Sequence, residues 1–114
     1  MQKGFLILAL HAHLPYVRHL EYEDFFEEHW LFEAIAETYM PLLRVFNRLE
    51  QDGVPWKLAV SISPTLITML EDGALQQRFI RYTERLLDLI GKEEERTRGQ
   101  AEYTSILEMY RDLH

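Results

Sequence analysis

The 114 residues are enough for one domain at most, and the hydrophobic fraction of 47% is ordinary for a globular protein. The 19 acidic side chains outnumber the 12 basic ones, and no segment gathers lysine and arginine on one face, which excludes electrostatic binding to nucleic acid or an anionic membrane. The net charge of -7 favours a neutral or cationic partner. The absence of cysteine excludes disulfides, thiolate nucleophiles and cysteine-type zinc sites, and agrees with a cytoplasmic location.

The first element is predicted at residues 5–10, which are uniformly apolar without alternation. This pattern is typical of a strand buried on both faces in a parallel sheet, and a helical core segment is the alternative. The run is too short for a membrane helix and lacks a small-residue cleavage site, so we expect neither a membrane span nor an export signal.

A charged and aromatic loop follows over residues 17–24, longer than a simple connection needs. A helix is predicted to begin near Glu27, with a kink or restart at Pro41, because proline lacks a backbone donor and clashes with the preceding turn. The pair Asp52-Gly53 is predicted to end this helix, since glycine suits a left-handed cap.

A second strand is predicted at residues 56–62, followed by a helix that Ser63 caps and Asp72-Gly73 ends. An amphipathic helix is predicted over residues 75–90, and the charged run 92–96 is predicted to be solvated helix surface or linker. A last apolar stripe recurs at helical spacing and consists of Tyr103, Ile106, Leu107, Tyr110 and Leu113. Two parallel strands cannot cover so many apolar helix faces, so we expect an incomplete α/β sheet.

The main candidate site is the pair His11 and His13, directly after the first apolar run. On an extended backbone, residues two apart point to the same side, so both imidazoles can address one space. They could bind a divalent metal, donate hydrogen bonds to sugar hydroxyls beside a stacking face on Tyr16, or be core histidines satisfied by backbone carbonyls. Ser63 is expected at the same rim, because loops after adjacent parallel strands meet at one edge of the sheet.

The string His-Ala-His-Leu-Pro-Tyr at residues 11–16 resembles the start of glycoside hydrolase family 57, and within it the α-1,4-glucan branching enzymes. Residues 30–34 and 37–43 resemble the segments that follow in the family, and Ser-Ile-Ser-Pro-Thr-Leu at residues 61–66 resembles its second strand and turn. The resemblance covers essentially the whole chain, but only the beginning of a family member.

The resemblance implies an α/β fold in which residues 1–114 are the N-terminal portion of a (β/α)7 barrel, an incomplete relative of the eight-fold barrel. It further implies a retaining mechanism with two carboxylates about 5 Å apart. The family's glutamate nucleophile and aspartate acid/base lie in downstream motifs, so we expect no catalytic residue in this chain. Four residues are expected to bind substrate, with no metal and no cofactor: His11, His13, Tyr16 and Ser63.

The remaining polar and aromatic candidates are expected to be structural or exposed. Capping and solvation explain the acidic residues Asp24, Glu27, Glu28, Glu33 and Glu37. His19 and His29 are expected at the surface, Trp30 is expected in a packed core rather than on a sugar, and Trp56 is expected to be structural.

The predicted function is therefore that of the N-terminal part of an α-glucan-acting enzyme of glycogen metabolism, with branching favoured over hydrolysis or glucanotransfer. Its expected partners are an α-1,4-glucan and the rest of the barrel, with no nucleic acid and no membrane. One alternative is a metal-dependent amidohydrolase-type barrel that uses His11 and His13 as ligands. The other is a non-catalytic helical interaction module.

Overall fold

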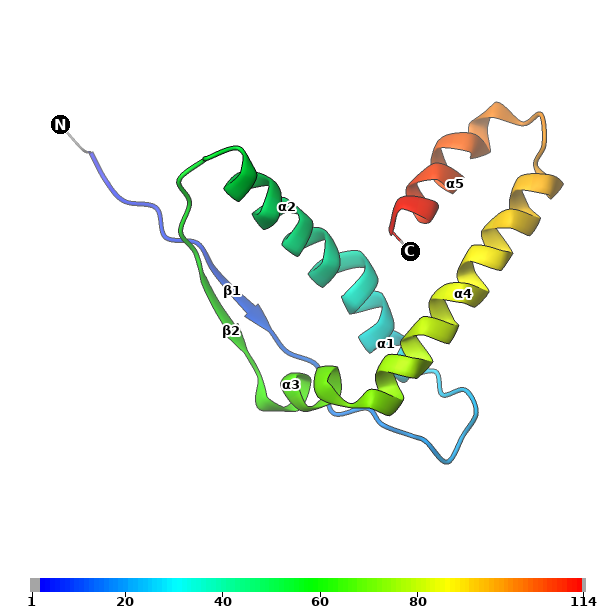
Figure 1. Cartoon of the computed structure of the whole chain (residues 1–114), viewed down its shortest axis with the longest axis horizontal. Coiled ribbons are helices and arrows are strands. Elements are labelled where there is room, and N and C mark those ends of the chain that lie inside the picture. The colour runs from blue at the N-terminus through cyan, green and yellow to red at the C-terminus, as the bar shows by residue number, and fades with distance from the viewer. Residues whose placement is uncertain (1–2, 114) are drawn as a thin grey trace.

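The computed structural model describes residues 3–113, which form two strands and a series of helices in an elongated shape of 59 × 42 × 21 Å (Figure 1). The elements are, in chain order, β1 (Ala9–Ala12), α1 (Glu28–Glu33), the π-helical η1 (Ala34–Tyr39), α2 (Met40–Gln51), β2 (Ala59–Ile62), α3 (Pro64–Glu71), α4 (Gly73–Arg96) and α5 (Ala101–Leu113). The predicted α/β arrangement is confirmed.

The two strands pair in parallel, with Ala9 opposite Ala59 and Ala12 opposite Ile62. Strand β1 therefore begins and ends later than the predicted residues 5–10, and β2 is shorter than the predicted residues 56–62. The ladder begins where the Ala59 amide donates to the Leu8 carbonyl over 3.1 Å. A strand needs a hydrogen-bonded neighbour, and within the described residues each strand meets only the other.

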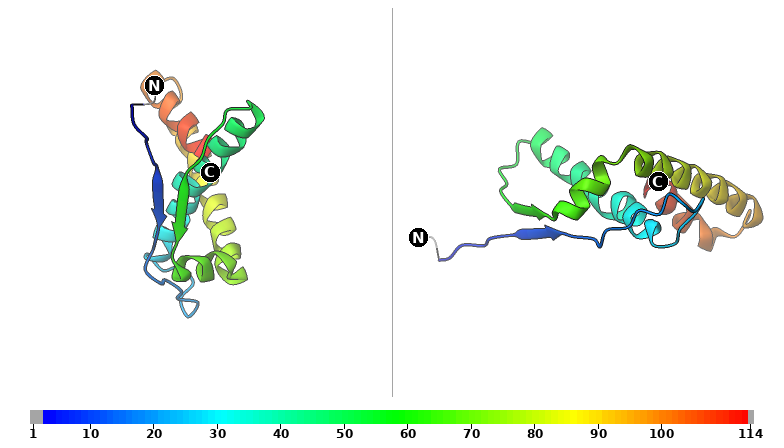
Figure 2. Two further views of the ribbon diagram at one scale, coloured as in Figure 1. Left: turned by 90° about the vertical axis from the view of Figure 1, so that its left-hand side faces the viewer. Right: turned by 90° about the horizontal axis from the view of Figure 1, so that it is seen from below.

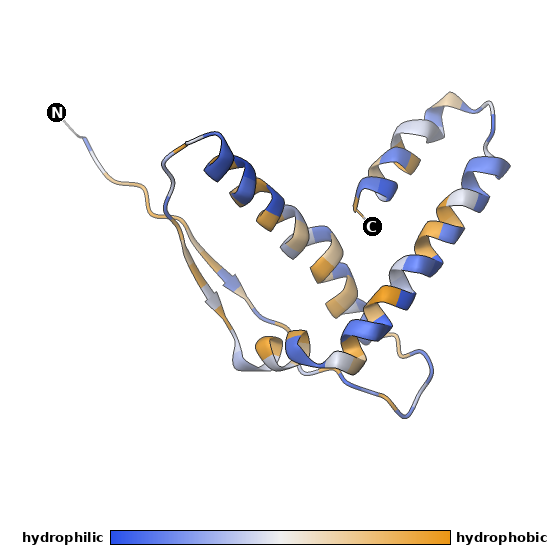
Figure 3. Cartoon of the chain, viewed as in Figure 1, coloured by the Kyte–Doolittle hydropathy of each residue, from blue (hydrophilic) through white to orange (hydrophobic). Residues whose placement is uncertain are grey.

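The apolar segment before β1 is exposed rather than buried on both faces. Phe5, Leu6 and Ile7 are all almost fully exposed, and Figure 3 shows this apolar stretch leading into the strand pair. Val60 and Ile62 of β2 are about half exposed as well. Exposed apolar side chains in this number are unusual for a complete sheet, so the described residues form only part of one.

The first long helix runs without a break from α1 through η1 into α2, although a kink or restart was predicted at Pro41. The π-helical segment ends at Tyr39, two residues before the proline, and the Met40 amide donates to the Ile35 carbonyl five residues earlier. This wider turn accommodates the missing donor and the ring of Pro41 at the start of α2. The predicted end is confirmed, since Gly53 has a φ of 65° directly after the C-cap Asp52.

The next two helices begin at residues with capping side chains. The Ser63 hydroxyl accepts a hydrogen bond from the Leu66 amide at the start of α3, as predicted. Asp72 ends α3 and caps α4, because its carboxylate accepts from the amides of Ala74 and Leu75. Two helices therefore meet at a single residue, and their directions are fixed relative to one another.

The core lies where the loop after β1 crosses α1, α3 and the start of α4. Its buried side chains are Val17, Leu31, Phe32, Leu66, Met69 and Leu75. Leu14 and Ala12 pack against this cluster from β1 and the following loop. Packing in this core therefore holds the end of β1 against the helices and fixes the position of the loop that carries Tyr16.

Helix α4 continues through the charged run 92–96, and α5 folds back along it, as Figure 2 shows from two further directions. Helix α4 runs away from the strand pair, and α5 runs back beside it. None of the helices within residues 3–113 is long and apolar enough to cross a membrane.

We expect the stability that Asp72 contributes to depend on pH. The hydrogen bond from Arg18, at 2.6 Å, and the capped amides hold the pKa of the Asp72 carboxyl below its ordinary value. A lowered folded-state pKa means that the contribution is complete above the unfolded value of about 4 and is lost as the pH falls through the folded value. In urea unfolding, wild type should be more stable than Asp72→Ala at pH 7, and the difference should shrink below about pH 4. A difference that stays constant down to pH 2 would contradict this cause.

Candidate functional site

His11 lies inside β1, not after it, directly opposite Ser61 in the strand register. Its Nδ1 is 2.6 Å from the Ser61 hydroxyl. This contact fixes the rotation of the imidazole ring and leaves the second ring nitrogen as the atom for another partner. Reasoning from the sequence missed Ser61, because the sequence does not determine which residue of the second strand lies opposite His11.

His13 follows β1 and lies on the same side as His11. The two ring centroids are 6.0 Å apart and the ring planes differ by only 9°. Both side chains are exposed. The pair therefore forms two parallel imidazoles at the end of the strand, as the alternation of an extended backbone requires.

Ser63 lies beside this pair through its backbone, because its amide donates to the Ala12 carbonyl between the two histidines over 3.0 Å. Its hydroxyl contacts the Leu66 amide and the Thr65 hydroxyl, so it is already used in capping α3. The structure thus places Ser63 at the shared edge but gives its side chain a structural role.

Tyr16 is 53% exposed, between two anchored neighbours on the loop after His13. The Leu14 carbonyl accepts from the Thr65 hydroxyl over 3.1 Å, and the Val17 amide lies 3.2 Å from the sulfur of Met69. The backbone around Tyr16 is therefore held on both sides against α3, while its ring faces solvent.

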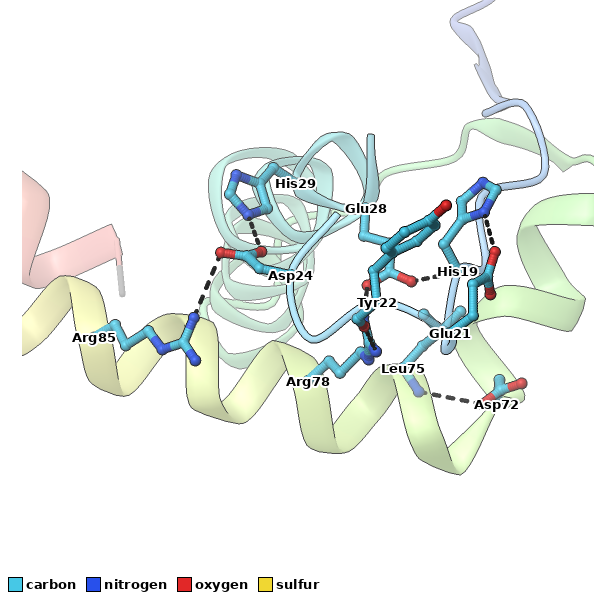
Figure 4. A network of polar contacts seen from close by, with 10 residues as sticks. All are labelled: His19, Glu21, Tyr22, Asp24, Glu28, His29, Asp72, Leu75, Arg78 and Arg85. Carbon is cyan, nitrogen blue, oxygen red and sulfur yellow. Dashed lines mark hydrogen bonds and ion pairs between the residues drawn. The ribbon is translucent and has the colours of Figure 1, made fainter. Parts of the chain in front are cut away.

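Glu28 corrects the expectation that the acidic residues of this region serve only in capping and solvation. It is 1% exposed, and its two carboxylate oxygens accept from the His19 amide at 2.8 Å and from Arg78 at 2.6 Å (Figure 4). Arg78 also donates to the Tyr22 carbonyl. We call Glu28 of α1 and Arg78 of α4 the buried ion pair. Because Glu28 also accepts from the His19 amide and Arg78 also donates to the Tyr22 carbonyl, this pair connects the loop after β1 to both helices.

The two histidines expected at the surface are partly buried and paired. His29 is 3.0 Å from Asp24, which also lies 3.5 Å from Arg85 of α4. The hydrogen bond with His29 is the main cause that lowers the pKa of Asp24. His19 packs its ring on Phe25 and contacts Glu21 at 3.0 Å. These contacts order the loop from both ends.

The two tryptophans differ in their outcome. Trp30 is 44% exposed, so the prediction that it packs in a core is wrong for the described residues. Its helix turns Leu31 and Phe32 into the core instead. Trp56 is structural as predicted, stacked on Phe46 with ring centroids 4.8 Å apart.

Across residues 3–113, no three histidine, aspartate or glutamate side chains are grouped so that they could hold a metal ion. His11 contacts the Ser61 hydroxyl, and its ring lies parallel to that of His13. The arrangement offers hydrogen-bond donors and acceptors on a solvent-facing edge, which suits a ligand rich in hydroxyl groups.

Comparison with known proteins identifies the family of the chain. The family model described as glycosyl hydrolase family 57 matches residues 7–112. A 1,4-alpha-glucan branching enzyme from Thermococcus kodakarensis is 45% identical over 85 residues, which is 75% of this chain and 12% of that protein. A probable branching enzyme from Mycobacterium tuberculosis is 32% identical over 69 residues, or 60% of this chain and 13% of that protein.

Solved structures match over 98% of the chain. The alpha-amylase AmyC from Thermotoga maritima superimposes with a TM-score of 0.88 at 42% identity, and the chain covers 21% of it. The branching enzymes from Thermococcus kodakaraensis and Pyrococcus horikoshii give TM-scores of 0.84 and 0.83 at 35% identity, with 20% and 21% covered. The prediction of an N-terminal portion of a (β/α)7 barrel is confirmed, and the chain spans about a fifth or less of these relatives.

Proposed function

Because the chain belongs to glycosyl hydrolase family 57, we propose that residues 1–114 form the N-terminal part of the catalytic barrel of an α-glucan-acting enzyme, and that its reaction is 1,4-α-glucan branching. The observation that carries the proposal is the parallel pair of His11 and His13 at the end of β1, within a chain that matches family members along nearly its whole length. Glycogen synthesis in the cytoplasm is the setting we propose, and a chain without cysteine suits a reducing compartment.

The proposed reaction is a double displacement at the anomeric carbon of an α-1,4-linked glucose. A carboxylate attacks that carbon while a carboxylic acid gives its proton to the leaving oxygen, forming a covalent glycosyl-enzyme. The 6-hydroxyl of an acceptor glucan then attacks the same carbon, the bond from that carbon to the first carboxylate breaks, and the hydroxyl proton goes to the group that gave up its proton in the first step. Both carboxylates would come from parts of the barrel outside this chain.

The described residues would bind and orient the donor sugar in this scheme. His11, fixed by Ser61, and His13 beside it would donate hydrogen bonds to sugar hydroxyls. Tyr16 would offer its exposed ring to a sugar face. The anchored loop around Tyr16 makes these positions available without rearrangement, which lowers the entropic cost of binding.

Hydrolysis is the second candidate, favoured by the likeness to the alpha-amylase AmyC at a TM-score of 0.88. The metal-hydrolase and helical-module alternatives gain no support, since the matched family is a glycosyl hydrolase family and the matched structures are enzymes.

The product linkages separate branching from hydrolysis. We expect a longer protein that carries this chain and the rest of a family 57 barrel to lower iodine staining of amylose and to create α-1,6 linkages visible by proton NMR. An increase in reducing ends without new linkages would indicate an amylase.

The 114-residue chain alone should leave amylose unchanged, because its histidines cannot replace a nucleophile and a proton donor. Activity of the chain alone, above a mock purification, would contradict the proposal.

A further inference from the structure

The contact between Ser61 and His11 joins two side chains that lie directly opposite one another on neighbouring parallel strands. A neutral imidazole carries one proton, which either ring nitrogen can hold, so this contact has two possible forms. In one form the Ser61 hydroxyl donates to a bare Nδ1 of His11. In the other form a protonated Nδ1 donates to the hydroxyl oxygen. The two forms give the second ring nitrogen, Nε2, opposite roles as donor or acceptor.

The distance between the two atoms favours the hydroxyl as the donor. Hydrogen bonds from an N–H group to oxygen span about 2.7–3.2 Å, whereas bonds donated by a hydroxyl to oxygen reach down to about 2.5 Å. The 2.6 Å between Nδ1 of His11 and the Ser61 oxygen lies below the first range. Nδ1 is therefore the acceptor, and the proton of the neutral ring lies on Nε2.

Backbone hydrogen bonds hold both residues in place. One bond lies before them at the start of the ladder, over 3.1 Å, and one lies after them, where the Ser63 amide donates to the Ala12 carbonyl over 3.0 Å. Between these bonds the Ser61 hydroxyl needs only to rotate to meet the His11 ring. A flip of that ring would break the contact and replace Nδ1 by a carbon atom. The orientation of the ring and the position of its proton are therefore set together.

We propose that Ser61 is a positioning residue for His11, and that its hydroxyl donates to Nδ1 and thereby keeps the proton of the neutral ring on Nε2. Nε2 points away from Ser61 and presents an N–H donor to a ligand oxygen. While it carries this proton, Nε2 has no lone pair with which to bind a metal ion. The assignment of the ligand oxygen to a sugar hydroxyl rests on the proposed function, but the position of the proton does not.

The proton position is measured by solid-state ¹⁵N–¹³C correlation NMR of a longer protein that carries this chain, with labelled histidines, at about pH 8, where an ordinary histidine is neutral. The His11→Gln spectrum assigns the His11 signals by difference. Wild type should show a bare Nδ1 and a protonated Nε2. Ser61→Ala should give a mixture of both tautomers, and Ser61→Thr, which keeps the hydroxyl, should restore the single form. Thr68→Ala removes an exposed hydroxyl that donates to the Pro64 carbonyl on α3, and this matched control should give the wild-type spectrum.

Steady-state kinetics on amylose test the consequence for the reaction, with circular dichroism to confirm that each variant is folded. Ser61→Ala should lower kcat/KM by roughly twofold to tenfold, in line with the net contribution of one hydrogen bond, and Ser61→Thr should recover most of this loss. A protonated Nδ1 in wild type, or a single unchanged tautomer in folded Ser61→Ala, would overturn the proposal. A changed tautomer with an unchanged kcat/KM would overturn the positioning role. If the longer protein does not act on glucans, the proposed function fails, and the NMR spectra still decide the position of the proton.

Discussion

Replacing Glu28 by alanine is expected to lower the free energy of unfolding by about 3–5 kcal/mol, because it leaves the buried guanidinium of Arg78 without its counter-charge. The same substitution removes the acceptor of the His19 amide. Few other single substitutions of charged residues in this chain should lower the free energy of unfolding as much, since most of its charged groups are exposed. Urea unfolding followed by far-UV circular dichroism measures the loss.

Glu33→Ala is the matched control, because Glu33 is an exposed carboxylate on the same helix, α1. It should change stability by less than about 0.5 kcal/mol. The double variant Glu28→Leu with Arg78→Met should be more stable than either single variant, since it removes both buried charges together. A loss for Glu28→Ala as small as that for Glu33→Ala would show that the ion pair is solvated in solution.

Replacing His11 or His13 by alanine in a longer family member that carries this segment should lower kcat/KM by roughly 10- to 1000-fold. The reason is the loss of a hydrogen bond that tightens around the sugar in the transition state. His13→Gln keeps a donor and should recover part of the activity. Steady-state kinetics on amylose measure these effects, with circular dichroism to confirm folding.

The metal content of the protein distinguishes sugar-binding histidines from the metal-binding histidines of a metal-dependent hydrolase. Sugar-binding histidines leave the metal content of the protein unchanged when they are replaced, whereas metal ligands lose a stoichiometric ion together with activity. Elemental analysis of the variants should therefore match wild type. A parallel loss of zinc or manganese would contradict sugar binding.

Ser61→Ala should weaken activity less than His11→Ala, because it removes only the contact that orients the ring.

Local signals predicted much of this fold. The caps at Ser63 and Asp72, the glycine that ends α2 and the helical spacing of α4 each depend on a few neighbouring residues, and each was confirmed. The side-by-side histidines follow from the alternation of an extended strand. These features can be predicted from the sequence because residues within a single turn or a single strand determine them.

Features that depend on distant residues were not predictable in this way. Glu28 meets Arg78 across 50 positions, so nothing near Glu28 distinguishes it from a solvated carboxylate at a helix start. The limits of β1 depend on which residues of β2 lie opposite it. The exposure of Trp30 depends on which elements pack against its helix face. Residues 11–16 could indicate the family, but not the register that brings Ser61 to His11.

The most direct test of the sugar-binding role is a crystal structure of a longer protein that carries this chain, soaked with a malto-oligosaccharide. We expect a glucose hydroxyl within about 2.7–3.2 Å of a ring nitrogen of His11 or His13, with no metal ion between the two imidazoles. A metal ion held by both rings, or an oligosaccharide bound in the barrel without contact to either histidine, would contradict the account.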